Sequence, residues 1–134
     1  MEHVLKNFTA VSDDDRPQKA IEIARQWARG EIKVGVAQKA AVAAHACARE
    51  IIARTPEQTA AIAIARAAGH AVATAHFAEH SLGGANYAIK AIAALGNSKL
   101  DERDWQLKQL PREIRTLVRS ALSDVRFASV MREQ

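Results

Sequence analysis

The stretches AQKAAVAAHACA (residues 37–48) and AAIAIARAAGHAVATA (residues 60–75) decide the fold of this 134-residue chain. Alanine accounts for 29 residues, most of them between positions 20 and 94, whereas aromatic residues make up only 4% of the chain. Alanine favours helices because it loses no side-chain entropy on helix formation, and its small side chain lets two helices pack closely. We therefore expect an all-α protein, a compact single-domain bundle with a thin core.

Helix starts and ends are marked by proline, glycine and capping residues. Pro17 follows three aspartates and Pro56 follows Thr55, which is typical of a first helical turn, where the N–H that proline lacks would be unpaired. Gly30 is the expected terminator of the first of these helices, and Ser98 and Asp101 are the candidate caps of a later one. The expected helices span about 16–29, 34–54, 56–80, 85–95, 100–110 and 111 to 126 or 131, with an interruption at residues 81–84 (Ser-Leu-Gly-Gly).

No segment shows the strict alternation of polar and apolar residues that marks a half-buried strand, so the sequence predicts a bundle of five or six helices. Residues 1–12 are expected to form an N-terminal arm or short helix, and residues 13–134 an alanine-rich helical domain. The single cysteine, Cys47, cannot form an intramolecular disulfide, and residues 1–15 lack the pattern of a signal peptide. Apolar runs are shorter than the ~18 residues of a membrane span. We therefore expect a cytoplasmic protein that does not enter a membrane.

Positive charge is concentrated in residues 16–54, which carry eight Lys or Arg and three Asp or Glu, while the whole chain has a net charge of +4. A basic helix face can attract an acidic protein or a phosphate backbone. No zinc-finger spacing, RNA-recognition motif or helix-turn-helix pattern accompanies these residues, so we do not expect nucleic-acid binding. The face expected to bind an acidic partner comprises Arg16, Lys19, Arg25, Arg29 and Lys33.

A polar stripe runs along the predicted helix 56–80. At 100° per residue, its Arg and His residues fall within a sector of about 120° on one helix face, with Gly69 and Ala73 between them. A histidine and an arginine also share a face of the preceding predicted helix. The polar stripe comprises His45, Arg49, Arg66, His70, His76 and His80.

The polar stripe has three interpretations. His76 and His80 have the spacing of two ligands to one Zn²⁺ or similar ion, with His70 or Glu79 as a third ligand, so binding of a metal ion or a small ligand is the alternative function. A His near an Arg can also perform acid–base or phosphoryl chemistry, but no nucleophile elbow, phosphate loop or carboxylate pair accompanies it, so we do not expect an enzyme. We favour a structural role, in which these side chains hydrogen-bond across helices to backbone carbonyls or carboxylates.

Three further features have both a structural and a functional interpretation. We expect the aspartates at residues 13–15 to cap a helix rather than to bind a cation, because Arg16 and then Pro17, in the first turn, follow them. Trp27 and Trp105 are expected in the core, although an exposed Trp on the basic helix would suit a partner interface. Cys47 lies among alanines and is expected to be a small buried residue rather than a nucleophile.

Several segments of the chain form an ordered series. They are DDDRPQKAIE (13–22), RQWARGEI (25–32), AHACAR (44–49), ARAAGHAVATAH (65–76), His80, YAIKA (87–91), Trp105-Gln106, Leu110-Pro111 and Arg115. This series resembles the immunity-five-like domain, an immunity-protein family of bacterial polymorphic-toxin systems. The resemblance covers about residues 13–118, and this chain has about a dozen residues where family members commonly have a longer N-terminal helical portion.

The resemblance implies an all-helical domain that binds and neutralises a cognate toxin, and it implies neither a catalytic residue nor a cofactor. We therefore expect the chain to occlude the active surface of a toxin domain by shape and charge, with the basic face as the first place to look for the interface. Exposed alanine faces on such a bundle also permit a homodimer.

Overall fold

The computed structural model describes residues 1–122, and every regular element in this range is an α-helix. The described residues form seven helices: α1 (Glu2–Thr9), α2 (Arg16–Ala28), α3 (Val34–Glu50), α4 (Pro56–Ala73), α5 (His80–Ala94), α6 (Lys99–Gln109) and α7 (Arg112–Leu122). The all-α prediction is confirmed. The prediction of five or six helices is wrong, because residues 2–9 form a helix of their own. The predicted end of the last helix, at residue 126 or 131, lies outside the described residues.

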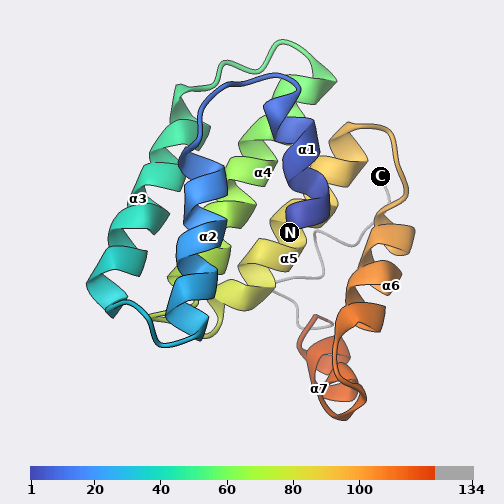
Figure 1. Cartoon of the computed structure of the whole chain (residues 1–134). Helices are drawn as coiled ribbons and strands as arrows, with labels where there is room; N and C mark the ends of the chain where they lie inside the picture. Colours follow the sequence, from blue (N-terminus) through green and yellow to red (C-terminus); the bar gives the residue numbers. More distant parts are fainter. Residues whose placement is uncertain (123–134) are drawn as a thin grey trace.

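Helix α4 occupies the centre of the bundle and packs against α1, α2, α3 and α5. Figure 1 shows α2 and α3 on one side of the bundle and α6 on the other, with α1 near the front. Helix α6 packs against α5, and α7 against α6. The central position of α4 explains its composition, because ten of its residues between Ala60 and Ala73 are buried and most of these are alanines.

The core is built mainly from small side chains. Its largest fully buried members include Phe8, Ile64 and Ile89, whereas most of the other buried hydrophobic residues are alanines. Small side chains at the contacts allow the helix axes to approach closely. Helix α1 contributes Val4 and Phe8 to the same cluster as α4 and α5, so the N-terminal helix packs as part of the bundle.

The prediction of one helix over residues 56–80, followed by an interruption at residues 81–84, is wrong. Helix α4 ends at Ala73, residues 74–79 form the connection, and α5 begins at His80 and runs through Gly83 and Gly84. A Cβ atom on Gly84 would lie 3.4 Å from the carbonyl oxygen of Ala67, an ordinary contact distance, which places this part of α5 directly against the backbone of α4. This packing compensates for the ~1 kcal/mol by which glycine disfavours a helix interior.

The predicted caps at Thr55, Ser98 and Gly30 are confirmed, whereas the predicted helix 34–54 ends earlier, at Glu50, because the backbone is already extended at Ile51. Thr55 Oγ1 accepts a hydrogen bond from the backbone N–H of Gln58 at the start of α4, and Ser98 Oγ accepts one from Asp101 at the start of α6. Gly30 follows α2 with a φ of 75°, a left-handed conformation that favours glycine. Within residues 1–122, no helix combines the length and hydrophobicity needed to span a membrane.

Candidate functional site

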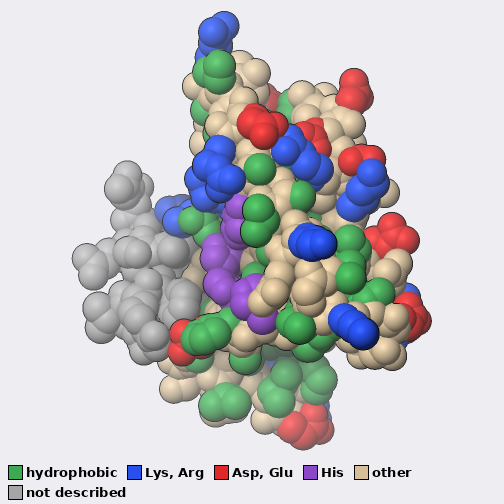
Figure 2. Space-filling view, turned by 90° about the vertical axis from the view of Figure 1, so that its left-hand side faces the viewer, with side chains coloured by type: hydrophobic (Ala, Val, Ile, Leu, Met, Phe, Trp, Pro, Cys, Tyr) green, Lys and Arg blue, Asp and Glu red, His purple; other side chains and the backbone are tan. Residues whose placement is uncertain are grey.

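The polar residues predicted to form a stripe do gather on one face of the molecule. We call this set the histidine–arginine patch: His45 and Arg49 from α3, Arg66 and His70 from α4, His76 from the connection 74–79, and His80 at the start of α5. Figure 2 shows histidine side chains in one strip on this face, with Lys or Arg side chains at its upper end. Arg49 and His76 are exposed, and the other four side chains are half-buried.

The imidazole rings of the patch form a chain of contacts centred on His70. The ring of His70 lies 5.0 Å from that of His45 and 5.1 Å from that of His80, centroid to centroid, and stacks on Tyr87 at 5.2 Å. His70 Nδ1 and His80 Nδ1 are 2.9 Å apart, so one ring donates the hydrogen bond and the other accepts it. His76 extends the chain, 5.5 Å from His80.

Two glycines provide the space for these rings. A Cβ atom on Gly69 would lie 2.8 Å from the ring of His45, and a Cβ atom on Gly83 would lie 2.8 Å from the ring of His70. The histidine of α3 is therefore seated on α4, and the histidine of α4 on α5. Sequence spacing could not show these contacts, because each glycine makes room for a histidine of a different helix.

Burial and neighbouring cations keep the central imidazoles neutral. Burial, followed by the charges of His45, His80 and Arg66, lowers the pKa of His70 from 6.5 to about 4. Burial also lowers the pKa of His45, and Arg66, Arg49 and His80 act in the same direction. The charged groups that act on these two imidazoles are thus all cationic. His45 Nδ1 is buried and has no hydrogen-bond partner among the described residues.

The patch differs from the predicted stripe in two respects. The four residues of the stripe from Arg66 to His80 do not lie on one helix, because the chain leaves the helix after Ala73 and the connection returns His80 to His70. The favoured structural interpretation holds only in part. His70 does hydrogen-bond across helices, but to the imidazole of His80 rather than to a carbonyl or carboxylate. Neither Arg49 nor Arg66 has an ion pair or side-chain hydrogen bond within residues 1–122.

The alternative of a metal site at His70, His76 and His80 is not supported. No group of three or more His, Cys, Asp or Glu side chains within residues 1–122 is arranged to hold a metal ion. The hydrogen bond between His70 and His80 also engages the Nδ1 atom of each ring.

The predicted basic face is largely paired with acidic residues of the same chain. Lys33 is exposed at the start of α3. The other four cations form ion pairs: Arg16 with Asp14 and Glu50, Lys19 with Asp15, Arg25 with Glu2, and Arg29 with Glu31. An acidic partner that approached this face would therefore compete with internal carboxylates.

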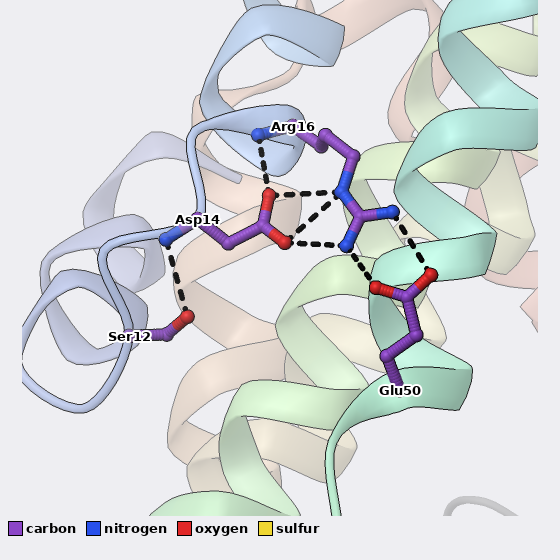
Figure 3. Close-up of polar contacts among 4 residues, drawn as sticks. All are labelled: Ser12, Asp14, Arg16 and Glu50. Carbon is purple, nitrogen blue, oxygen red and sulfur yellow. Dashed lines mark hydrogen bonds and ion pairs between the residues drawn. The ribbon is translucent and has the colours of Figure 1, made fainter.

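Arg16 links the start of α2 to the end of α3. In Figure 3 its guanidinium group lies between the carboxylates of Asp14 and Glu50. Asp14 Oδ1 also accepts a hydrogen bond from the backbone N–H of Arg16 at 3.0 Å, and Ser12 Oγ accepts one from Asp14 N at 3.2 Å. The hydrogen bond from the guanidinium group of Arg16 lowers the pKa of Asp14 to about 2. The predicted capping role holds only in part: Asp14 binds the first backbone N–H of α2 from the position before the N-cap, whereas Asp15, the N-cap residue, makes no capping hydrogen bond with its side chain.

The two tryptophans line an apolar cavity that the sequence did not predict. Trp27 is half-buried, but Trp105 is 41% exposed, so the prediction of a core position for Trp105 is wrong. Trp105 instead contacts the ring of His3 at 4.1 Å, and His3 Nε2 lies 2.9 Å from Glu102. The cavity has a volume of about 500 Å³ and lies between α2, α4, α5 and α6. Its walls come from four helices, with alanines from α2, α4 and α5 and with Trp105 and two glutamines from α6, so they leave no local motif in the sequence. No residue of the patch lines this cavity.

Cys47 is buried, and its surroundings disfavour the thiolate form. Its side chain is 1% exposed, and burial, followed by the adjacent Asp14 carboxylate, raises the pKa of its thiol to about 11. A thiol with this pKa stays protonated at neutral pH, whereas the thiolate is the nucleophile. The prediction of a small buried residue is confirmed.

The helical bundle and its surface define an all-α domain with a thin alanine core and a patch of cationic and imidazole side chains on one face. The model of a family described as "Imm-5 like putative immunity protein" matches residues 1–113. The chain belongs to this family, as its sequence resemblance predicted. The match includes α1 to α6 and ends at the start of α7. No curated protein and no solved structure matches the chain.

Proposed function

We propose that this chain is a non-catalytic immunity protein that acts in the cytoplasm by binding a cognate toxin domain and covering its active surface. The observation that carries this proposal is membership of the immunity-protein family over residues 1–113. A toxin partner follows from the family. Occlusion of the active surface is our proposal for the mechanism.

The chemistry of the described residues supports a binding role. Cys47 is buried and its pKa is raised, so its thiol is not a ready nucleophile. General-base catalysis uses a histidine that is hydrogen-bonded to a hydroxyl or carboxylate group. His70 is instead bonded to another imidazole, that of His80. The surface carries arginines and exposed apolar side chains, which suit protein interfaces.

Co-expression tests this function. The toxin domain to use is the variable C-terminal domain of a large secreted protein encoded beside this chain, and a metabolic operon at that place would count against the proposal. Cells that express the toxin domain alone should stop growing, and cells that also express this chain should grow. Cell death in both cultures would contradict an immunity function.

The interface predicted from the sequence stays a prediction. It is the basic face that comprises Arg16, Lys19, Arg25, Arg29 and Lys33. Charge reversal with Arg25→Glu and Arg29→Glu should weaken toxin binding if this face is the interface, and unchanged binding would exclude it. A homodimer also stays a prediction, and the mass of the purified chain in sedimentation equilibrium checks it.

A further inference from the structure

We propose that the histidine–arginine patch is the docking surface for an acidic segment of the toxin domain, with Arg49 and Arg66 pairing with its carboxylates. This inference rests on the proposed immunity function and names the surface and the chemistry through which it acts. It differs from the sequence prediction, which placed the interface on the basic face of α2 and the start of α3.

The pairing state of the cations distinguishes the two faces. Arg25 and Arg29 already pair with Glu2 and Glu31, so a carboxylate from a partner must replace an existing ion pair there. Arg49 and Arg66 have no such partner within residues 1–122, so a carboxylate that binds to them adds an ion pair without breaking one. Charge complementarity therefore favours the patch.

The surroundings of the patch also suit a protein partner. Phe77 is 57% exposed and its ring lies 5.9 Å from that of His80, and Val42 is 65% exposed. Val42 and Arg49 are seven residues apart in α3, which places them on the same side of that helix. Arginine and aromatic side chains that stand beside apolar side chains are the composition of protein-binding hot spots.

A protein segment fits the patch better than a nucleic acid. Binding to a phosphate backbone relies on many cations, often in a stripe, because each neutralised phosphate adds to the affinity. The patch has two arginines, set between half-buried imidazoles and exposed apolar groups. Two charges with apolar neighbours suit a short acidic segment that also has apolar contacts.

An acidic partner would change the protonation of the patch. The groups that face His70 and His45 are Arg49 from α3, Arg66 from α4, and His80 and Tyr87 from α5, with His76 beside His80 and the exposed Glu79 just before it. A bound carboxylate opposes the cations that lower the pKa values of the two imidazoles, so it favours their charged forms. Docking should therefore be accompanied by proton uptake, and affinity should rise as the pH falls from 7.5 to 6.0.

A hexaglutamate peptide probes the patch without the toxin. We expect the peptide to shift the imidazole NMR signals of His45, His70 and His80 in the full chain, and to bind more tightly at pH 6.0 than at pH 7.5. The peptide stays ionised over this range because glutamate has a pKa near 4.3. Hexaglutamine is the control for charge. NMR signals that shift only around α2 would overturn the proposal. Tighter binding of a deoxythymidine dodecamer than of hexaglutamate would also overturn it, in favour of a nucleic-acid partner.

Two double variants, each lacking two arginines, then test which face binds the toxin domain. Arg49→Gln with Arg66→Gln should weaken binding of the toxin domain by tenfold or more and reduce growth protection. Arg25→Gln with Arg29→Gln should change binding by less than twofold. Neither Arg49 nor Arg66 has an ion pair or side-chain hydrogen bond within residues 1–122, so the first variant should fold normally, which its thermal unfolding curve checks.

The outcomes separate this inference from the proposed function. Protection by the wild type that is lost in the Arg49→Gln, Arg66→Gln variant supports the docking surface. Equal protection by the wild type and both variants overturns the docking surface and leaves the immunity function intact. No protection by the wild type overturns the immunity function and, with it, the toxin as the occupant of the patch.

Discussion

His70 Nδ1 lies 2.9 Å from His80 Nδ1 across the contact between α4 and α5. This bond needs one Nδ1 with a proton and one without, so it is lost when both rings are charged. His80 is the first residue of α5, which means that the bond fixes the start of that helix against the end of α4. The protonation state of the patch is thus coupled to the packing of the two helices.

Acidification should destabilise the chain before its carboxylates titrate. The pKa of His70 is about 4 in the folded state and near 6.5 in the unfolded state, so the unfolded chain binds more protons between these values. Stability is therefore complete above pH 6.5 and falls as the pH is lowered towards 4. The loss should stay below the ~1.4 kcal/mol per pH unit of one fully linked proton, because the ring is half-buried. Urea unfolding at pH 7.0, 6.0 and 5.0 measures it.

Two single variants assign this pH dependence. His70→Gln should reduce the slope of stability against pH, and His45 should account for the part that is left, because burial lowers its pKa too. His76→Gln should retain the full slope, since its side chain is exposed. A wild-type chain equally stable at pH 7.0 and 5.0 would show that the imidazoles are not linked to folding.

The glycine under His70 should not accept a side chain. In Gly83→Ala the new Cβ atom would lie 2.8 Å from the ring of His70, which is held by its bond to His80. Overpacking costs about 1–3 kcal/mol, which outweighs the gain in helix propensity, so the free energy of unfolding should fall. Gly35→Ala is the matched control in a helix, because nothing lies within 4 Å of its Cβ position. We expect that control to be neutral or stabilising, and equal effects of the two substitutions in urea unfolding would show that the ring of His70 moves freely.

Local signals in the sequence predicted the parts of the fold that depend on local chemistry. Thr55 and Ser98 were identified as helix starts because their hydroxyl groups satisfy backbone donors within three residues. Gly30 was identified as a terminator because of its access to positive φ. The helical class followed from the alanine content.

Features that depend on contacts between distant segments were not predicted. Gly83 and Gly84 are turn formers in isolation, and they are helical here because α4 packs against them. The end of α4 at Ala73 was missed because the residues that follow continue the helical pattern as far as His80. The pairing of Arg25 with Glu2 joins α2 to a segment more than twenty residues earlier, so the charge pattern of α2 alone could not show that its basic face is neutralised.

Asp14 should be the aspartate that stabilises the start of α2. Asp14→Ala removes the hydrogen bond to the backbone of Arg16 and one of the two carboxylates that hold the Arg16 guanidinium. Loss of a capping carboxylate typically costs about 0.5–2 kcal/mol, and we expect a decrease of this size in the free energy of unfolding at pH 7. Asp13→Ala is the control, since Asp13 is exposed and forms no ion pair among the described residues. A larger decrease in the free energy of unfolding for Asp13→Ala would show that Asp13, and not Asp14, stabilises the start of α2.

The thiol of Cys47 should be protected in the folded chain. Its side chain is 1% exposed, and burial and Asp14 raise its pKa to about 11, so both access and thiolate formation are suppressed at pH 8. The reagent DTNB should react slowly with the native protein and quickly in 6 M guanidinium chloride. In Asp14→Ala the nearby negative charge is absent, which lowers the pKa of the thiol, yet burial remains, so the native reaction should stay far slower than that of the unfolded chain. Rapid labelling of the native wild-type chain would mean that α3 separates from its neighbours often enough to expose the thiol, and the packing of α3 on α4 would then have to be weaker than its buried alanines indicate.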